Sequence, residues 1–366
     1  MSRFERQHIL PGFGREGQEK LSQARVLVVG AGGLGCPALL HLAAAGVGTI
    51  GIADGDSVSE SNLNRQTLFG QNDIGKPKAE TAANGLKQKY PDIQFDIFPN
   101  YLTTENAFEI IKHYDLVLDG SDNFGTRYMI NDACVLLKKP LIMGAIYQYE
   151  GQVAVFNYGE APINYRDIYP VPPRDNEIPN CSETGVLGVL PGIIGTLQAA
   201  ETIKLISGLG KSLTNKILFY NLKSCSFYEV EVKPNPVSGK NIPENEETFR
   251  KTNYNLTCGL AENISWEKAL DWFRNLESSM LIDIRELNEE PGFGLKGIKK
   301  IPMDKLAENP GHLEQVEHVL LFCKSGQRSL KLAEQLKQKF PEKKIFSVEG
   351  GILHPSSPLK TENHGT

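Results

Sequence analysis

The sequence predicts an α/β protein of two domains, each built around a mostly parallel β-sheet. Short apolar runs rich in β-branched residues alternate with helical stretches up to about residue 235, and the alternation resumes after residue 253. The stretch between them is rich in Pro, Asn, Glu and Lys, which is typical of a linker. A chain of 366 residues can form two cores of ordinary size. We expect a first domain over 1–235, a linker over 236–253, a smaller α/β domain over 254–358 and a tail over 359–366.

Charge and composition argue against several classes of partner. The net charge of −5 at pH 7 disfavours a nucleic acid, because phosphate backbones are usually bound by a basic face. Residues 1–6 lack the apolar core of a signal peptide. The longest nearly uncharged run, 185–200, contains Pro191 and is expected to be too short to span a bilayer. We therefore expect a soluble cytoplasmic protein that binds neither membrane nor nucleic acid, with reduced cysteines because no C-x-x-C pair is present.

The first predicted strand, 25–29, runs into the glycine-rich turn Gly30-Ala31-Gly32-Gly33-Leu34-Gly35. A helical stretch over 39–45 and a second strand over 49–53 follow, and an acid ends this strand. The order is that of a nucleotide-binding, Rossmann-like βαβ unit, in which the turn approaches a phosphate and the acid accepts ribose hydroxyls. The turn alone would also permit a nicotinamide dehydrogenase. The expected nucleotide-binding residues of this unit are Gly30, Gly32, Gly33, Gly35 and Asp54.

The same alternation predicts the other elements of the first domain. Helices are expected over 77–90, 105–113 and from 189, and strands over 93–98, 116–119, 141–147, 151–158, 216–221 and 226–232. The carboxyl ends of parallel strands meet at one edge of a sheet, where ligands bind. Four polar residues lie just beyond predicted strands, or in the loops and helix starts after them, and could meet at this edge: Arg65, Lys78, Asp122 and Asn123.

In the second domain, an amphipathic helix is expected over 264–273, with strands over 280–285 and 319–322. The second of these strands runs directly into Cys323 and a glycine-containing loop. The next helix has apolar residues every four positions, which gives it one face toward a core: Leu332, Leu336 and Phe340. Loop amides and the helix N-terminus should favour the Cys323 thiolate, and Arg328 adds a cation.

Several motifs in residues 1–235 together resemble the adenylating enzymes that activate ubiquitin-like sulfur carriers. These are the molybdopterin-synthase and thiamine-pathway adenylyltransferases, relatives of ubiquitin-activating enzyme. The motifs are Arg3-x-x-Arg6-Gln7, the turn at Gly30–Gly35, Asp54, Ser61-Asn62-Leu63-Asn64-Arg65-Gln66, Gly75-Lys76-Pro77-Lys78, Asp119-Gly120-Ser121-Asp122-Asn123 and the run at Pro191-Gly192. The resemblance implies an ATP-binding domain that acts with magnesium on the C-terminal glycine of a carrier protein.

The resemblance also implies a role for each polar residue. Attack of a carboxylate on the α-phosphorus of ATP brings two anions together, so the site must supply cations rather than a general base. Arg65 and Lys78 would neutralise the phosphates, and Asn62 would orient the phosphate chain. Asp54 would hold the ribose, and Asp122 would hold magnesium.

Three further expectations come from the same resemblance. Arg6 looks like the arginine that reaches into the site of a second subunit, which implies a homodimer. Family members often bind zinc through two C-x-x-C pairs, but the matching positions here, 164–167 and 238–241, offer no thiol or imidazole, so we expect no zinc. Cys181 matches the family's candidate cysteine for a covalent carrier or sulfur adduct, although it could also be simply a buried thiol.

The second domain resembles a rhodanese domain, whose cysteine carries a persulfide. The resemblance rests on Cys323-x-x-Gly-x-Arg328 after an apolar strand and on Leu281-Ile282-Asp283-Ile284-Arg285-Glu286 some forty residues earlier. The region 292–298 lacks the histidine often seen in this family. A phosphatase-like Cys-x5-Arg loop is the rival, but only four residues separate Cys323 from Arg328. An inactive docking module is a third possibility.

Together the two domains predict ATP-dependent adenylation of the C-terminal glycine of a ubiquitin-like sulfur carrier. A persulfide sulfur, supplied by a cysteine desulfurase or thiosulfate, would then displace AMP and leave a thiocarboxylate. An alternative is an adenylating enzyme for protein conjugation whose rhodanese-like half only recruits partners. The sequence does not choose among molybdopterin, thiamine and tRNA or other sulfur pathways.

Overall fold

The computed structural model describes residues 3–170, 185–236, 238–254, 262–290, 297–313, 316–340, 342–354 and 356–358. The described residues form two compact units, one ending at Tyr254 and one beginning at Glu262. Cys181 and the expected tail, 359–366, lie outside them.

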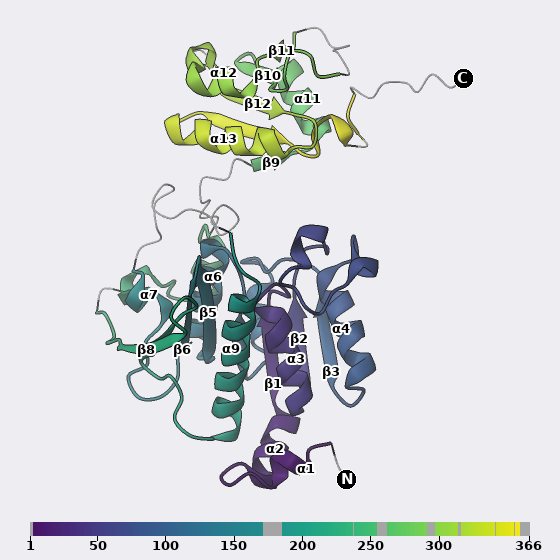
Figure 1. The fold of residues 1–366 in the computed structure, drawn as a ribbon. Helices are drawn as coiled ribbons and strands as arrows, with labels where there is room; N and C mark the ends of the chain where they lie inside the picture. The colour runs from purple at the N-terminus through teal and green to yellow at the C-terminus, as the bar shows by residue number, and fades with distance from the viewer. Residues whose placement is uncertain are drawn as a thin grey trace. The chain divides into compact units, whose positions relative to one another are not determined.

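The first unit is built on an eight-stranded sheet (Figure 1). Five strands in the order β3-β2-β1-β4-β5 are parallel, and β6, β7 and β8 continue the sheet in antiparallel fashion. The mostly parallel, Rossmann-like sheet predicted from the sequence is therefore confirmed. The strands are β1 (Arg25–Val29), β2 (Thr49–Ala53), β3 (Gln94–Phe98), β4 (Leu116–Asp119), β5 (Leu141–Tyr147), β6 (Glu150–Phe156), β7 (Lys216–Asn221) and β8 (Ser226–Glu231).

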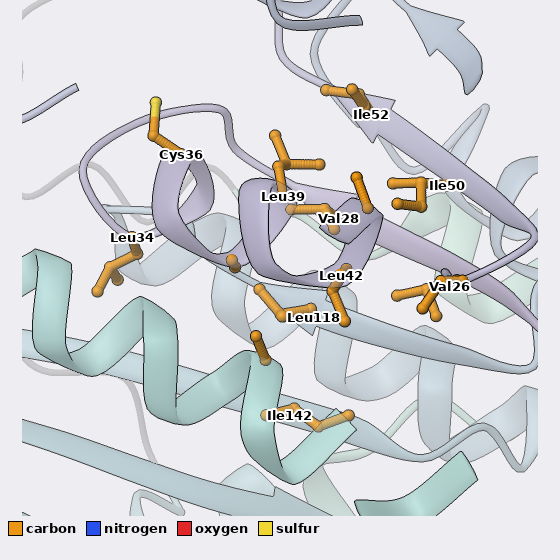
Figure 2. Packing of buried hydrophobic residues seen from close by; sticks show 14 of the residues in the cluster. Val26, Val28, Leu34, Cys36, Leu39, Leu42, Ile50, Ile52, Leu118 and Ile142 are labelled. Carbon is orange, nitrogen blue, oxygen red and sulfur yellow. The ribbon is translucent and has the colours of Figure 1, made fainter. Parts of the chain in front are cut away.

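Two hydrophobic cores lie on the two faces of this sheet, because successive residues of a strand point to opposite faces. Val26 and Val28 belong to one core, part of which Figure 2 shows, and Leu27 and Val29 belong to the other. The first core also contains residues of α3, α4 and α9, and the second contains residues of α5 and α6. The helices are α1 (Glu5–His8), α2 (Gly14–Gln23), α3 (Gly35–Ala45), α4 (Lys78–Lys89), α5 (Ala107–Ile111), α6 (Phe124–Leu137), α7 (Tyr165–Ile168), α9 (Val189–Ser207) and α10 (Glu246–Lys251), with short 3₁₀ turns η1 (Glu60–Asn62), η2 (Gln71–Asp73) and η3 (Ser238–Asn241).

The apolar run near residue 190 forms a longer helix than the sequence indicated. The 19 residues of α9 are long and apolar enough to cross a membrane by length and composition alone, so the expectation that the run is too short was wrong. The helix packs against α3 and against β5 and β6. Leu190, Ile194 and Ala199 are buried in the first core, and this packing accounts for the apolar composition.

The segment expected to be a linker, 236–253, is instead folded onto the first unit. Phe249 of α10 is fully buried, with its ring centroid 4.8 Å from that of Phe108. Just beyond the segment, the Tyr254 hydroxyl donates to the buried carboxylate of Asp132 at 2.7 Å. The expectation was wrong because a few buried side chains can dock a segment whose average composition is polar.

The second unit contains a five-stranded parallel sheet in the order β11-β10-β12-β13-β9. Helices α12 and α13 cover one face and α11 covers the other. Leu332 and Leu336 of α13 are buried, as their spacing predicted, whereas Phe340 at the end of the helix is only partly buried. The elements are β9 (Glu262–Ile264), α11 (Trp266–Asn275), β10 (Ser279–Asp283), β11 (Lys299–Lys300), α12 (Met303–Glu308), η4 (Pro310–Leu313), β12 (His318–Phe322), α13 (Gln327–Lys339), β13 (Lys344–Val348) and η5 (Gly351–Leu353).

Candidate active sites

A cavity of about 550 Å³ opens at the carboxyl edge of the first unit's sheet. It lies beyond the ends of β1, β2 and β4, where open α/β sheets bind their ligands. Three of the expected site residues of this unit do not line it: Arg6, Gly35 and Asn62. The others among the described residues do: Gly30, Gly32, Gly33, Asp54, Arg65, Lys78, Asp122 and Asn123.

The glycine turn is closed by backbone contacts that leave no room for side chains. A Cβ on Gly35 would lie 1.8 Å from the carbonyl oxygen of Gly30, and a Cβ on Gly30 would lie 2.8 Å from that of Gly120. Gly30 also has a φ of +90°, which favours glycine. Gly30 and Gly35 are therefore needed for the turn itself. Gly32 and Gly33 line the cavity just before α3, whose N-terminus can stabilise a phosphate.

Asp54 ties the glycine turn to the loop after β2. Its Oδ2 accepts the Ala31 N–H at 2.7 Å, and its Oδ1 accepts the Asp56 N–H at 2.8 Å. Burial raises the pKa of Asp54, while these two N–H groups and the Lys78 ammonium oppose the shift. The ribose contact expected from the sequence stays a prediction. The structure adds that Asp54 holds together the two loops that a nucleotide would contact.

Asp56, which sequence reasoning missed, is the partner of Lys78. The Lys78 Nζ donates to Asp56 Oδ2 at 2.8 Å, and the Tyr101 hydroxyl donates to Oδ1. Burial works to raise the pKa of Asp56, but the bonds from Lys78 and Tyr101 outweigh it and lower the pKa. An ionised Asp56 therefore fixes the Lys78 ammonium in the cavity wall. The available signal was a second acid two residues after Asp54.

Asp122 is the cavity carboxylate best placed to receive a cation. Asp54 and Asp56 each accept two hydrogen bonds, and the buried Asp119 accepts the Ser121 N–H at 2.8 Å. Burial raises the pKa of Asp119. Asp122 is exposed, and its side chain has no hydrogen bond or ion pair within the described ranges of the chain. Carboxylate oxygens are ligands that Mg²⁺ prefers, so Asp122 fits the role implied by the resemblance.

Arg65 is presented by the polar loop that follows η1. Its Nη1 donates to the Ser61 carbonyl oxygen at 2.9 Å and to Asn64 Oδ1 at 3.0 Å, which leaves the guanidinium without an acidic partner among the residues described. The Asn62 side chain accepts the Ser59 N–H at 3.2 Å and so closes its own turn. Asn64, not Asn62, lines the cavity. The motif alone does not show which of the two asparagines faces the cavity.

The last motif of the first domain continues into α6. Asn123 Oδ1 accepts the Thr126 N–H at 2.9 Å, as an N-cap residue does. Arg127, one turn into the helix, donates from Nη2 to the Ser121 carbonyl oxygen at 3.0 Å and also lines the cavity. Sequence reasoning missed this third cation. It could have been found from the helix that starts after Asn123. Arg127 lies four residues after Asn123 and therefore returns to the same side of that helix.

Arg6 belongs to α1, the short helix that Figure 1 shows beside α2 at the lower end of the first unit. This helix packs on α2. Ala24 directly follows α2, and its carbonyl oxygen accepts the N–H of Thr49, the first residue of β2, at 3.0 Å. The five residues of β2 separate this end from the cavity by about 17 Å. An arginine side chain is shorter than this, so the exposed Arg6 cannot reach the cavity of its own chain.

The two segments that match the family's zinc-binding positions, 164–167 and 238–241, lie against each other. Asp167 Oδ1 accepts the Asn235 N–H at 2.7 Å and the Ser238 hydroxyl at 2.5 Å. Asp167 Oδ2 accepts the Asn164 N–H at 2.7 Å. Hydrogen bonds to Asp167 thus join the first segment to Ser238 and to Asn235, which precedes the second segment. Neither segment holds the thiolate or imidazole ligands typical of structural zinc.

In the second unit, Cys323 follows β12 and its sulfur lies at the start of α13. The Sγ accepts the Ser329 N–H at 3.4 Å, and the side chain is fully buried. Gly326, in the loop between them, has a φ of +86°, and a Cβ there would lie 3.0 Å from the backbone nitrogen of Gly350. The sulfur therefore faces an amide in the first turn of α13, and the thiolate expected from the sequence stays a prediction.

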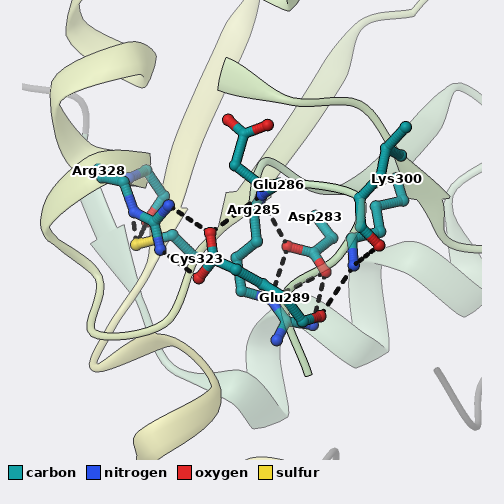
Figure 3. Close-up of polar contacts among 9 residues, drawn as sticks. Asp283, Arg285, Glu286, Glu289, Lys300, Cys323 and Arg328 are labelled. Atoms are coloured by element: carbon teal, nitrogen blue, oxygen red, sulfur yellow. Dashed lines mark hydrogen bonds and ion pairs between the residues drawn. The ribbon is translucent and has the colours of Figure 1, made fainter. Parts of the chain in front are cut away.

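Arg328 is held by Glu289, which sequence reasoning missed. The two nitrogen–oxygen distances of this pair are 2.6 and 2.8 Å, and Figure 3 shows the guanidinium in contact with both the Glu289 carboxylate and the Cys323 sulfur. The bond from Arg328 lowers the pKa of Glu289 to about 2. Lys300 donates to the Glu289 carbonyl oxygen at 3.0 Å and so fixes this loop. The acids that follow the strand at β10 were the only signal in the sequence.

The ThiF family model matches residues 4–240. Over 370 residues the chain is 39% identical to the probable adenylyltransferase/sulfurtransferase MoeZ of Mycobacterium tuberculosis (strain ATCC 25618 / H37Rv), a match that covers 96% of this chain and 92% of that protein. It is 36% identical over 373 residues to the adenylyltransferase and sulfurtransferase MOCS3 of Drosophila grimshawi, covering 96% and 83%. The sulfur carrier protein adenylyltransferase of Thermus thermophilus is 48% identical over 265 residues, covering 71% of this chain and 97% of that one.

Solved structures of Escherichia coli MccB share the fold. A crystal structure titled with MccA-N7isoASN has a TM-score of 0.58 and 21% identity, and the match covers 64% of this chain and 73% of that one. A crystal structure titled with ATP has a TM-score of 0.55 and 20% identity, covering 64% and 76%.

The two-part names of the relatives that span both units agree with the two sites. The chain is an enzyme, an adenylyltransferase that uses ATP and carries a sulfurtransferase domain of the rhodanese type. The nicotinamide dehydrogenase that the glycine turn alone permitted is thereby set aside. By the family match over 4–240 and by its similarity to these relatives, the chain belongs to the ThiF family.

Proposed function

We propose that the protein adenylates the C-terminal glycine of a ubiquitin-like sulfur carrier and then exchanges AMP for sulfur to give a thiocarboxylate. The arrangement of the first cavity carries this proposal. Arg65, Lys78 and Arg127 line it beside a glycine turn and one available carboxylate, Asp122. Such a site suits the reaction of two anions, since a carboxylate is already a nucleophile at neutral pH and needs no base.

In the first step, a carboxylate oxygen of the carrier bonds to the α-phosphorus of ATP, and pyrophosphate leaves as the bond to its bridging oxygen breaks. Lys78, oriented by Asp56, and Arg65, which has no acidic partner in the described structure, stabilise the negative charge on the phosphates. Asp122 would hold magnesium, which supplies further positive charge to the phosphates.

In the second step, the terminal sulfur of a persulfide on Cys323 bonds to the acyl carbon of the adenylate, and AMP leaves. A second thiol then attacks the Cys323 Sγ. The bond between the two sulfurs breaks, the thiocarboxylate is released, and a disulfide forms that a cellular thiol must reduce. Cys181 is our candidate for the second thiol. A cysteine desulfurase or thiosulfate would reload Cys323.

We propose that the protein acts as a homodimer in the cytoplasm. The homodimer is inferred from Arg6, because the cavity of its own chain lies at the far end of the sheet. The cytoplasm is inferred from the sequence alone. If Arg6 contacts the nucleotide as the resemblance implies, it must contact the nucleotide bound to a second copy. The absence of zinc also remains a proposal, supported by the ligand types at 164–167 and 238–241.

Weighing the carrier is the direct test. The protein is incubated with ATP, a persulfide donor and candidate ubiquitin-like carriers, and each carrier is examined by mass spectrometry. We expect one carrier to gain the mass difference between sulfur and oxygen, only when ATP is present. A carrier joined to another protein without gaining sulfur would support the conjugation alternative. The carrier that reacts also selects among the molybdopterin, thiamine and tRNA pathways.

A further inference from the structure

Tyr101 is an exposed aromatic residue in the wall of the nucleotide cavity. It follows β3, and 63% of its surface is accessible to solvent. A single exposed aromatic side chain is ordinary on a protein surface. Tyr101 differs from this ordinary case because the structure fixes both ends of the residue.

Three contacts hold Tyr101 in place. Its hydroxyl donates to Asp56 Oδ1, and its carbonyl oxygen accepts a hydrogen bond from Asn106 Nδ2 at 3.1 Å. A Cβ on Gly55 would lie 2.8 Å from two atoms of the Tyr101 side chain, Cγ and Cδ2, so the ring rests directly on the Gly55 backbone. The aromatic ring is thus oriented in advance while much of it stays uncovered, which is the property of a stacking surface for a planar ligand.

The order of the strands shows which part of a nucleotide would reach Tyr101. Along the carboxyl edge of the sheet, β1 leads to the glycine turn, its neighbour β2 leads to Asp54, and the next strand, β3, leads to Tyr101. Phosphates on the turn and a ribose near Asp54 would direct the base toward the loop after β3. Leu102, also in this loop, adds an apolar side chain to the cavity lining.

We propose that Tyr101 is a base-binding residue of the adenylation site, whose ring stacks on the base of the bound nucleotide. The inference rests on the proposed function for the identity of the nucleotide as ATP. Its physical basis is that every purine presents a π face, and a fixed aromatic ring binds that face without first losing side-chain freedom.

The test compares two variants that differ in the aromatic ring. Tyr101→Phe keeps the ring and removes the hydroxyl, whereas Tyr101→Leu removes both. Calorimetry on the full-length protein measures the Kd of ATP and of inorganic tripolyphosphate, which has no base. We expect Tyr101→Leu to bind ATP about 5- to 100-fold more weakly than Tyr101→Phe, with equal affinities for tripolyphosphate. Tyr158→Leu, at an exposed tyrosine outside the cavity, is the control and should bind ATP like the wild type.

Two results would overturn the inference. One is equal ATP affinity in the Phe and Leu variants, and the other is an equal loss for ATP and tripolyphosphate in the Leu variant, which would assign the effect to the phosphates. Melting temperatures close to that of the wild type confirm that the variants are folded, as expected for an exposed side chain. Failure of the wild type to bind ATP at all would instead count against the proposed function.

Discussion

The Lys78 ammonium lies 2.8 Å from the Asp56 carboxylate, and its side chain is only 6% exposed whereas that of Asp56 is 48% exposed. A buried ammonium is costly unless a partner compensates its charge. Asp56 therefore allows a cation to stand at low solvent exposure beside the phosphate-binding turn, where its interaction with a developing charge is strongest.

Arg65→Ala, Lys78→Ala and Asp122→Ala should each lower carrier-dependent ATP–pyrophosphate exchange by about 10² or more, because each removes a charge from the site. Exchange of labelled pyrophosphate into ATP measures the effect. The matched control is Lys76→Ala. Lys76 belongs to the same motif but pairs with Asp73 at 3.1 Å outside the cavity, so this variant should exchange at nearly the wild-type rate. Wild-type rates in the first three variants would contradict the assignment of the site.

Arg6→Ala and Asp122→Ala should each be inactive alone, and mixing them should restore part of the activity. In a heterodimer, one of the two sites would receive an intact Arg6 from one chain and an intact Asp122 from the other. Pyrophosphate exchange after mixing is the measurement, with subunit exchange shown independently by native mass spectrometry. Lack of recovery despite subunit exchange would mean that Arg6 has a structural role instead.

Cys323→Ser should leave pyrophosphate exchange nearly intact and abolish sulfur transfer, so that the carrier stops at the adenylate. The charges expected to stabilise adenylation all belong to the first unit, whereas Cys323 and the helix start beside its sulfur belong to the second. The control is Cys225→Ser, which changes an exposed cysteine of the first unit and should not affect either step. Thiocarboxylate formed at the normal rate by Cys323→Ser would make the second unit a docking module.

Glu289→Gln should make the second unit less stable at pH 6 than the wild type, and the difference should shrink as the pH falls from about 4.5 to about 2. The bond from Arg328 lowers the pKa of Glu289 from its ordinary value of 4.5 to about 2. The stabilisation is therefore present above the unfolded-state pKa and is lost on acidification toward the folded-state pKa. Urea unfolding followed by tryptophan fluorescence reports this unit alone, because the chain's two tryptophans are Trp266 and Trp272. A difference that does not change with pH would refute this account.

Protein purified without chelator should contain well under one zinc per chain by elemental analysis. The segments 164–167 and 238–241 are already joined through Asp167, and they contain no thiol or imidazole. One zinc per chain that survives dialysis would show that its ligands lie elsewhere.

Much of the fold could be predicted because its signals are local. The expected strands 116–119, 141–147 and 216–221 coincide with β4, β5 and β7, since apolar runs bounded by turn residues mark buried strands directly. The linker at 236–253 could not be predicted correctly. This segment docks because Phe249 packs into the second hydrophobic core of the first unit. Residues that it contacts there, such as Phe108, lie more than a hundred positions earlier in the chain.

The sequence by itself determined the glycine turn, the order of the charged motifs and the position of Cys323 between a strand and a helix. Only the tertiary structure decided which charges are paired. Asp56 is 22 residues from Lys78, and Glu289 is 39 residues from Arg328, so neither pair follows a helical or strand period. A hydrogen-bond partner depends on where loops from different strands meet at a sheet edge, and local patterns of residues do not contain that information.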